Sequence, residues 1–284
     1  FIMRINTNIS SLGAQEAAKN TNNSIANSLE KLSTGLKINK ASDDASGLAI
    51  ADKLRTQATS INQGISNGNS AVTLLQIADK SMGEQSNILD TVKAKLIQAN
   101  TDTTSSEGRA SIAKDIAKLL EQLNNIGKQT NYNGRQLISN VAGTGGSSAH
   151  VFQVGEKSSD TIKMKTVNAN TTGLTLTVLS GNVGTPASFT KTMAATAQTA
   201  VNKAINTLNG FRGDIGSTQN QVESAVRNLM TQATNVKAAE SIIRDVDYAQ
   251  ESANFNKQNI ISQAGSYAIS QANSVQQNVL RLLQ

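Results

Sequence analysis

The sequence contains no cysteine and no tryptophan, and its 284 residues include one proline, three tyrosines and five phenylalanines. The lack of cysteine excludes disulfides, thiolate metal sites and cysteine nucleophiles. Compact globular cores normally contain large aromatic side chains, whereas long helices packed side by side can close a seam with Leu, Ile, Val and Ala alone. The near absence of proline also favours long uninterrupted helices. Together these scarcities favour a mainly helical protein.

Groups that carry catalysis or bind metals are also few. His150 is the only histidine, and because it follows a Gly- and Ser-rich stretch we expect it at the surface, without a role as ligand or base. The sequence has neither the H-E-x-x-H motif of zinc peptidases nor a phosphate-binding loop. Asp43 and Asp44 are adjacent, and adjacent side chains on a helix diverge, so we expect a helix cap or an inter-subunit polar contact, with Lys37 and Arg55 as candidate partners. The sequence therefore predicts no enzyme, no metal and no cofactor.

The net charge is +6, but the basic residues are not clustered. The densest patch, Lys93 and Lys95, has no interleaved aromatic residue, so we do not expect a nucleic-acid partner. No apolar run of about 20 residues is present, so we expect no membrane span. The N-terminus also lacks the charged, apolar and small-residue order of a cleaved secretory signal. If the protein leaves the cell, we expect a route that cleaves no such signal.

The clearest pattern is a seven-residue repeat of apolar residues from 201 to 243, a period typical of helices that supercoil around their neighbours. A matching stripe covers residues 75–99, with Gln85 as its one polar member, and a shorter helix is predicted at 112–126 after a polar turn at 101–108. The predicted fold is mainly α, a long antiparallel helical bundle or coiled-coil rod, although these stripes alone fit a soluble three-helix bundle equally well. The expected seam consists of Leu75, Met82, Leu89, Leu96, Leu208, Ile215, Val222, Leu229 and Val236.

The middle of the chain has a different pattern. Residues 143–148 are rich in Gly and Ser, residues 151–154 and 161–167 alternate like strands, and residues 174–179 are a third candidate strand. Asn133-Gly134, just before this region, is a turn signal because both residues tolerate positive φ. We therefore expect a small β element in the middle of the chain.

The two ends of the chain are nearly uncharged. Residues 254–284 contain two charged side chains and residues 1–29 contain three. Exposed helix faces normally carry many charges, so a polar but uncharged face suggests contact with other copies or with an enclosed space. We expect both ends to be mobile in the monomer and to become ordered on assembly. The candidate inter-subunit contacts are Ile5, Ile9, Leu12, Ile25, Leu29, Leu32, Leu36, Ile261, Ala268, Val275, Val279 and Leu282.

Several motifs stand out near the two ends of the chain. At the front these are I-N-T-N at 5–8, L-S-T-G-L-K-I-N-K-A-S-D-D-A-S-G-L-A-I-A at 32–51, Q-T-N-Y-N-G at 129–134 and F-Q-V-G at 152–155. At the back they are A-E-S-I-I-R-D-V-D-Y-A-Q-E at 239–251, I-S-Q-A at 261–264 and Q-A-N-S-V-Q-Q-N-V-L-R-L-L-Q at 271–284. These motifs resemble those of bacterial flagellins, and they occur in that family's order and cover both ends of the chain.

The resemblance implies a secreted structural subunit, exported unfolded by the flagellar type III apparatus, that polymerises into the flagellar filament for swimming. It implies an inner-tube helix and connecting segment at 1–43, rod helices at 44–142 and 193–240, an inner-tube helix at 241–284, and a short variable β region at 143–192. In that region, the Ser and Thr residues from Ser158 to Thr192 are candidate sites of O-linked sugars, as in some relatives.

The implied partners are other copies of the chain, the flagellar cap, hook-junction proteins and an export chaperone at the C-terminal helix. Two alternatives stay open at this point. One is a flagellar hook-filament junction protein, which shares related ends. The other is a secreted coiled-coil effector or adhesin that binds a host protein.

The resemblance extends to innate immunity. The rod-helix motif L-Q-R-V-R-E-L, through which the Toll-like flagellin receptor recognises many flagellins, corresponds to residues 89–95 of this chain. Thr91 stands at an arginine position of the motif, Lys95 at a leucine position, and Asp115 at the glutamate position of the neighbouring helix. Interface energy is concentrated in a few anchors, so loss of an Arg fork and an apolar contact predicts weak or no receptor activation.

Overall fold

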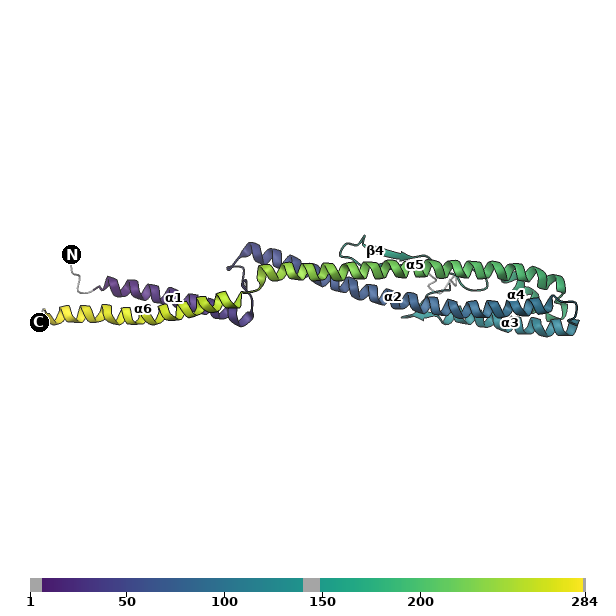
Figure 1. Cartoon of the computed structure of the whole chain (residues 1–284), viewed down its shortest axis with the longest axis horizontal. Helices are drawn as coiled ribbons and strands as arrows, with labels where there is room; N and C mark the ends of the chain where they lie inside the picture. The colour runs from purple at the N-terminus through teal and green to yellow at the C-terminus, as the bar shows by residue number, and fades with distance from the viewer. Residues whose placement is uncertain (1–6, 140–148, 283–284) are drawn as a thin grey trace. The chain divides into compact units, whose positions relative to one another are not determined.

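The computed structural model describes residues 7–139 and 149–282 and is mainly α, which confirms the predicted fold class (Figure 1). The chain forms two compact units: unit 1 comprises residues up to Ala58 and from Thr234 onward, and unit 2 comprises Thr59–Ala233. The helices are α1 (Ile9–Thr34), α2 (Ala45–Ala99), α3 (Ser106–Gln129), α4 (Thr177–Gly184), α5 (Lys191–Arg244) and α6 (Tyr248–Leu282), with a short 3₁₀ helix, η1, at Pro186–Ser188. The strands are β1 (Asn131–Tyr132), β2 (Arg135–Gln136), β3 (His150–Gln153) and β4 (Thr161–Met164).

Unit 2 is built on antiparallel helices. Asp79 of α2 pairs with Arg212 of α5 at 2.9 Å, and Asp102, just past the end of α2, pairs with Lys191 at the start of α5 at 2.7 Å. Residue numbers therefore rise along one helix as they fall along the other. Of the nine seam residues expected from the repeat, Val236 is half-buried and the others are buried.

Local signals explain where the helices of unit 2 begin and end. The Ser105 hydroxyl accepts a hydrogen bond from the Gly108 N–H at 3.1 Å and so caps α3, as serine does before a helix. After α3, the β1-β2 hairpin turns at Asn133 and Gly134, whose φ angles are 51° and 78°. Both residues accept positive φ, which a two-residue hairpin turn of this hand requires.

The β element consists of two antiparallel hairpins, β1-β2 and β3-β4. The strands expected at 151–154 and 161–167 are present as β3 and β4. The third strand expected at 174–179 is wrong, because residues 177–184 form the helix α4. Leu176, Leu179 and Val183 are buried at steps of three and four, which is a helical spacing. A short apolar run does not distinguish a strand from a buried helix.

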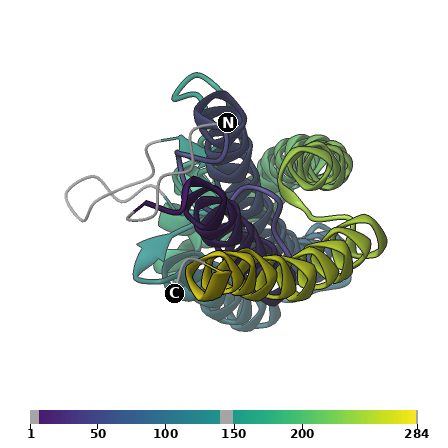
Figure 2. The ribbon, with the colours of Figure 1, turned by 90° about the vertical axis from the view of Figure 1, so that its left-hand side faces the viewer.

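Unit 1 contains the antiparallel pair α1 and α6. The Asn8 side-chain amide donates to the Ala272 carbonyl at 3.1 Å, and the Ser262 hydroxyl donates to the Asn22 side-chain oxygen at 3.4 Å. Figures 1 and 2 both show the two helices side by side. Within the described residues, no helix has the length and apolar character needed to cross a membrane.

Candidate assembly surface at the chain termini

The faces of α1 and α6 that meet each other carry mainly small side chains. Buried and half-buried residues recur every three or four positions on both helices, which is the spacing of one helix face. The larger apolar residues on these faces, Ile25, Leu32, Phe255 and Ile269, are half-buried. The small ones are Ser11, Ala14, Ala18, Thr21, Ser24 and Ser28 on α1 and Ser262, Gly265 and Ala272 on α6. Within the described part of α1, only Ser11 and Ser28 are fully buried, so the pair buries little apolar surface within one molecule.

Most large apolar side chains of this pair are turned outward. They are Ile9, Leu12 and Leu29 on α1 and Ile260, Ile261, Tyr267 and Val275 on α6. Ile9 is 69% exposed and Tyr267 is 76% exposed. Soluble monomers rarely expose extended apolar surface without an interaction that covers it. Ile260 and Tyr267 were not predicted from the sequence because they lie beside the seven-residue step and not on it.

The other expected contact residues have mixed positions. Ala268 is exposed, whereas Ile25, Leu32 and Leu36 are half-buried. Leu36 also forms an isolated antiparallel β-bridge with Asp245. Ile5 lies outside the described residues, and so do the side chains of Val279 and Leu282.

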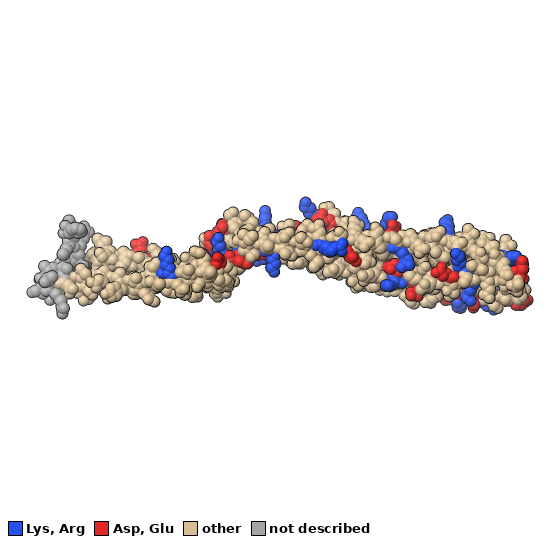
Figure 3. All heavy atoms as spheres, viewed as in Figure 1, with Lys and Arg blue, Asp and Glu red and all other residues tan. Residues whose placement is uncertain are grey.

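Charge is sparse on the α1-α6 pair and dense beside it. Between residues 9 and 29 of α1 and between residues 252 and 275 of α6, the charged residues are Glu16, Lys19 and Lys257. Figure 3 shows this part of the surface as almost uniformly uncharged, with acidic and basic side chains gathered where the linkers of unit 1 lie. An uncharged apolar surface can be covered without the desolvation cost of buried charges.

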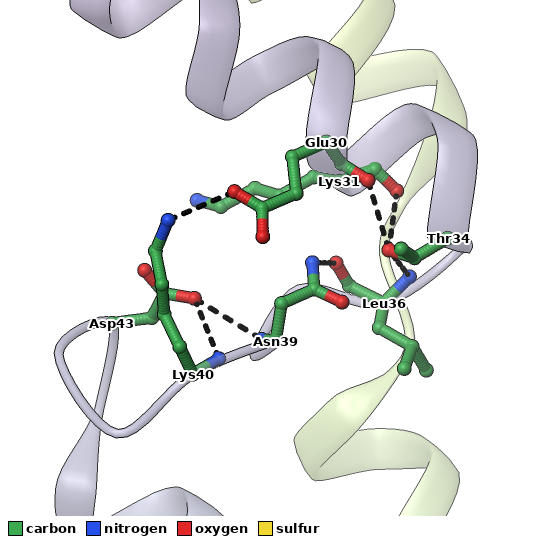
Figure 4. A network of polar contacts seen from close by, with 7 residues as sticks. All are labelled: Glu30, Lys31, Thr34, Leu36, Asn39, Lys40 and Asp43. Atoms are coloured by element: carbon green, nitrogen blue, oxygen red, sulfur yellow. Dashed lines mark hydrogen bonds and ion pairs between the residues drawn. The ribbon is translucent and has the colours of Figure 1, made fainter.

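A polar network organises the linker between α1 and α2 (Figure 4). Lys40 forms an ion pair with Glu30 at 2.8 Å, and this hydrogen bond raises the pKa of Lys40. The Asp43 carboxylate accepts hydrogen bonds from the backbone N–H groups of Asn39 and Lys40, each at 3.1 Å. The Asn39 N–H is the main cause of a lowered Asp43 pKa. The Asn39 side chain donates to the Leu36 carbonyl at 3.1 Å, which closes the network.

The α1-α2 linker is joined to the α5-α6 linker by backbone hydrogen bonds. The Lys37 N–H donates to the Arg244 carbonyl at 2.7 Å, and the Val246 N–H donates to the Gly35 carbonyl at 3.0 Å. Gly35 has a φ of 73° and ends α1 in the left-handed conformation that glycine favours. A Cβ at this position would lie 2.9 Å from the Tyr248 hydroxyl oxygen. The end of α1 therefore favours glycine at position 35.

The adjacent carboxylates Asp43 and Asp44 have different roles. Asp44 Oδ1 accepts a hydrogen bond from the Gly47 N–H at 2.9 Å at the start of α2, so the expectation of a helix cap is confirmed. Asp43 holds the linker in place through backbone N–H groups, as described above. Arg55, which we named as a candidate partner, pairs with Asp52 at 2.9 Å.

His150 was expected at the surface, and this expectation is wrong because the residue is 4% exposed. It starts β3 and pairs with the buried Met164 of β4. Burial lowers the pKa of the imidazole, and the nearby Arg135 cation lowers it further, while a backbone hydrogen bond involving Gln136 acts in the opposite direction. The Gly- and Ser-rich stretch before His150 suggested a surface position. Its pairing with Met164 instead places His150 on the buried side of the β3-β4 hairpin.

The three receptor-related residues lie in unit 2. Lys95 forms an ion pair with Asp115 at 2.8 Å, between α2 and α3. The Thr91 hydroxyl donates to the Asn87 carbonyl of its own helix at 2.9 Å. The altered positions are therefore satisfied within the molecule, and Lys95 and Asp115 neutralise each other.

The described residues offer little to catalysis. No group of three or more His, Asp or Glu side chains among them is arranged to hold a metal ion. A hollow of about 720 Å³ in unit 2 is lined by Thr73, Gln76, Ile77, Asp79, Lys80, Ser81 and Gln219. Its one carboxylate, Asp79, pairs with Arg212 at 2.9 Å. The one carboxylate of the hollow is therefore engaged in an ion pair.

The sequence matches two family models over most of its length. The model described as "Bacterial flagellin N-terminal helical region" matches residues 5–142, and "Bacterial flagellin C-terminal helical region" matches residues 198–283. The chain is 33% identical to the flagellin of Bacillus subtilis (strain 168), over 99% of this chain and 100% of that protein. It is 31% identical to the flagellar filament 33 kDa core protein of Treponema phagedenis, again over 99% of this chain and 100% of that protein.

Two solved structures are similar to this one. The crystal structure of Bacillus cereus flagellin has a TM-score of 0.50 and 28% identity, and the match covers 62% of this chain and 94% of that chain. A putative flagellar hook-associated protein from Vibrio parahaemolyticus has a TM-score of 0.60 over 71% of this chain and 99% of that chain, but at 13% identity it supports the fold alone. The family matches and the full-length relatives show that this chain belongs to the bacterial flagellin family and is a structural subunit of the extracellular flagellar filament.

Proposed function

We propose that the outward faces of α1 and α6 are the surface through which copies of this chain pack in the filament, and that both helices are stably ordered only after assembly. The observation that carries this proposal is the outward orientation of Ile9, Leu12, Leu29, Ile260, Ile261, Tyr267 and Val275. Full burial of a Leu or Ile side chain contributes about 1.5–3 kcal/mol. Isolated helices are marginal in water and depend on packing for stability. Contacts between copies supply the burial that the α1-α6 pair lacks.

A matched pair of double variants tests the surface. Leu12→Gln with Leu29→Gln places polar groups on the outward face, and Leu12→Met with Leu29→Met keeps the apolar character and the approximate volume. In seeded polymerisation we expect the Gln variant to stop elongating and the Met variant to elongate normally. Unimpaired elongation of the Gln variant would contradict the proposed surface. Neither a hook-filament junction protein nor a secreted effector is expected to elongate seeds into long filaments, so the wild-type arm also tests these alternatives.

Circular dichroism tests the ordering step. We expect the helix content per chain to rise when the monomer polymerises, because α1 and α6 gain packing partners. Equal helix content before and after polymerisation would contradict the proposed ordering of α1 and α6. If a chain trimmed of both termini still formed ordinary filaments, the proposed role of the termini in assembly would be wrong.

The uncharged character of the terminal helices also fits export through the filament. A channel lined by Gln, Asn and Ser would hold a passing unfolded chain only weakly, because it offers no charges to bind its peptide groups or side chains strongly. We expect Gln271→Asp together with Ser274→Asp to slow filament growth. Unchanged growth at normal export would count against this role. The flagellar cap, hook-junction proteins and an export chaperone at α6 are proposed partners on the strength of family membership.

We also propose that the chain activates the Toll-like flagellin receptor weakly or not at all. The ion pair between Lys95 and Asp115 supports this, because a receptor side chain would have to displace an existing partner at each position. Thr91 cannot supply the bidentate fork of an arginine. In reporter cells we expect Thr91→Arg with Lys95→Leu to raise the response, and Lys93→Leu as a control to leave it low. A wild-type response equal to that of a strongly stimulating flagellin would overturn this proposal.

Finally, we propose that the protein has no catalytic activity. The burial of His150 and the ion pair that engages Asp79 support this. A turnover of any common ester or phosphate substrate by purified filaments, lost on denaturation, would contradict it.

A further inference from the structure

Gln85 is the one polar side chain in the seam of α2, and it is fully buried between Met82 and Leu89 on the same stripe. Its side-chain nitrogen donates two hydrogen bonds, to the Leu123 carbonyl of α3 at 3.0 Å and to the Ala169 carbonyl at 2.7 Å. Both N–H groups of the amide are therefore used, and their acceptors belong to two separate segments. A buried amide is costly without partners, so this position is stable only where both carbonyls are present.

The α3 carbonyl that Gln85 reaches lies one turn before a glycine. Leu123 is four residues before Gly127, the second and last glycine of α3. A Cβ at Gly127 would lie 3.7 Å from the Gln85 amide nitrogen, which is ordinary van der Waals contact. The Gln85 amide therefore packs closely against α3 at this turn.

The second acceptor lies in a short segment that crosses the bundle between β4 and α4. The Ala169 N–H donates to the Ile138 carbonyl at 2.7 Å, so both backbone groups of Ala169 are engaged. Two residues later, the Thr171 N–H and hydroxyl donate to the Asn124 side-chain oxygen of α3, at 2.9 and 3.1 Å. Ala169 and Thr171 are buried. We call residues 167–171 the clip, because amides from α2 and α3 hold it against the bundle.

We infer that Gln85 fixes the axial register of α3 and the clip against α2. An apolar seam selects a register less strictly than a buried polar group that must meet its partners. A slip of α3 by one turn, about 5.4 Å, would carry the Leu123 carbonyl away from Gln85, and the clip that Asn124 of α3 holds would be displaced with it. A polar residue at one seam position is an established means of selecting register in coiled coils. Gln85 is thus a positioning residue, distinct from the terminal surface proposed for assembly.

The absence of cysteine makes the register measurable. Spin labels can be attached to Lys80→Cys on α2 and Lys114→Cys on α3, both exposed, and the distance between them measured by double electron-electron resonance. In the otherwise unchanged chain we expect a single narrow distance population. Gln85→Met keeps the length of the side chain without its donors, and we expect it to add a second population displaced by about 5 Å. Met82→Leu, one turn away in the same seam, is the control and should keep the single population.

Hydrogen exchange gives an independent measurement. We expect the Ala169 amide to exchange roughly five- to tenfold faster in Gln85→Met than in the Met82→Leu control, because the clip loses one of its hydrogen bonds. Gln85→Leu provides a second apolar replacement for both measurements. One narrow distance population and unchanged exchange in both Gln85 variants would overturn the inference. Loss of helical circular dichroism in both variants would also overturn it, because Gln85 would then be needed for folding itself and not for register.

Discussion

Two glycines in the interior of α2 should respond differently to substitution by alanine. A Cβ added at Gly64 would lie 2.6 Å from the carbonyl oxygen of Val154. This oxygen belongs to the backbone just after β3, and the neighbouring Gln153 carbonyl accepts a hydrogen bond from the Asn67 side chain at 3.1 Å. The hairpin backbone therefore cannot yield as the end of a flexible side chain would. A Cβ added at Gly83 would meet no atom within 4 Å.

The magnitude follows from comparing the two variants. Replacing Gly by Ala in a helix interior gains about 0.8–1 kcal/mol at either site. Because this gain is shared, the difference between Gly64→Ala and Gly83→Ala isolates the cost of overpacking, about 1–3 kcal/mol. We expect Gly83→Ala to stabilise unit 2 by about 1 kcal/mol and Gly64→Ala to be neutral or destabilising by up to about 2 kcal/mol. At about 2–4 °C per kcal/mol for a domain of this size, the two midpoints should differ by about 2–12 °C.

The assay is thermal unfolding of the monomeric chain, followed by far-ultraviolet circular dichroism, with urea unfolding as a second measurement. Gly213→Ala in α5 is a further control, because a Cβ at that position also meets no atom within 4 Å. It should stabilise the chain as Gly83→Ala does. If Gly64→Ala raised the midpoint as much as Gly83→Ala, the reasoning would be refuted, since the hairpin backbone would then not be packed against α2 at Gly64.

Three further substitutions have expected outcomes. Thr175 has a φ of 58°, and Asn adopts this left-handed region more readily than Thr. Thr175→Asn should therefore raise the free energy of unfolding, measured by urea unfolding, by about 1 kcal/mol. A decrease would contradict backbone strain at Thr175. His150 has a lowered pKa in the folded chain, so below about pH 6.5 the unfolded chain binds the proton first and the free energy of unfolding decreases as the pH falls. His150→Phe should reduce the change in the unfolding midpoint between about pH 7 and pH 5. An unchanged pH dependence of the midpoint would exclude His150 as its source. Asp44→Ala removes the cap of α2 and should cost about 1 kcal/mol, while Asp44→Ser should cost much less.

The sequence predicted the seam of unit 2 because a seven-residue period encodes burial directly. Leu208, Ile215 and Val222 recur at this step and are completely buried. The prediction failed at α4, where the run from Leu174 to Leu179 is too short for its period to separate helix from strand. Burial of His150 could not be predicted either, because it depends on the pairing of β3 with β4, which brings separate segments together.

The linkers of unit 1 show a second limit. The backbone hydrogen bonds between Gly35 and Val246 and between Lys37 and Arg244 join segments far apart in the chain. No local sequence pattern predicts them. The glycine itself was visible in the sequence, but its need for a positive φ appears only once α1 ends beside Tyr248. Helix caps such as Asp44 were predictable because a cap acts within four residues.

The contrast between α1 and α3 supports the proposal that the α1-α6 pair completes its burial by assembly. The two helices have similar lengths, 26 and 24 residues, so length does not separate them. α3 buries Ile112, Ile116, Leu120 and Leu123, whereas the residues of α1 that are fully buried are Ser11 and Ser28. Each buried Leu or Ile contributes about 1.5–3 kcal/mol, whereas a buried hydroxyl contributes about as much as its hydrogen bond, near 1 kcal/mol. The side chains at the facing positions, and not helix length, therefore decide whether burial is completed within one chain or between copies.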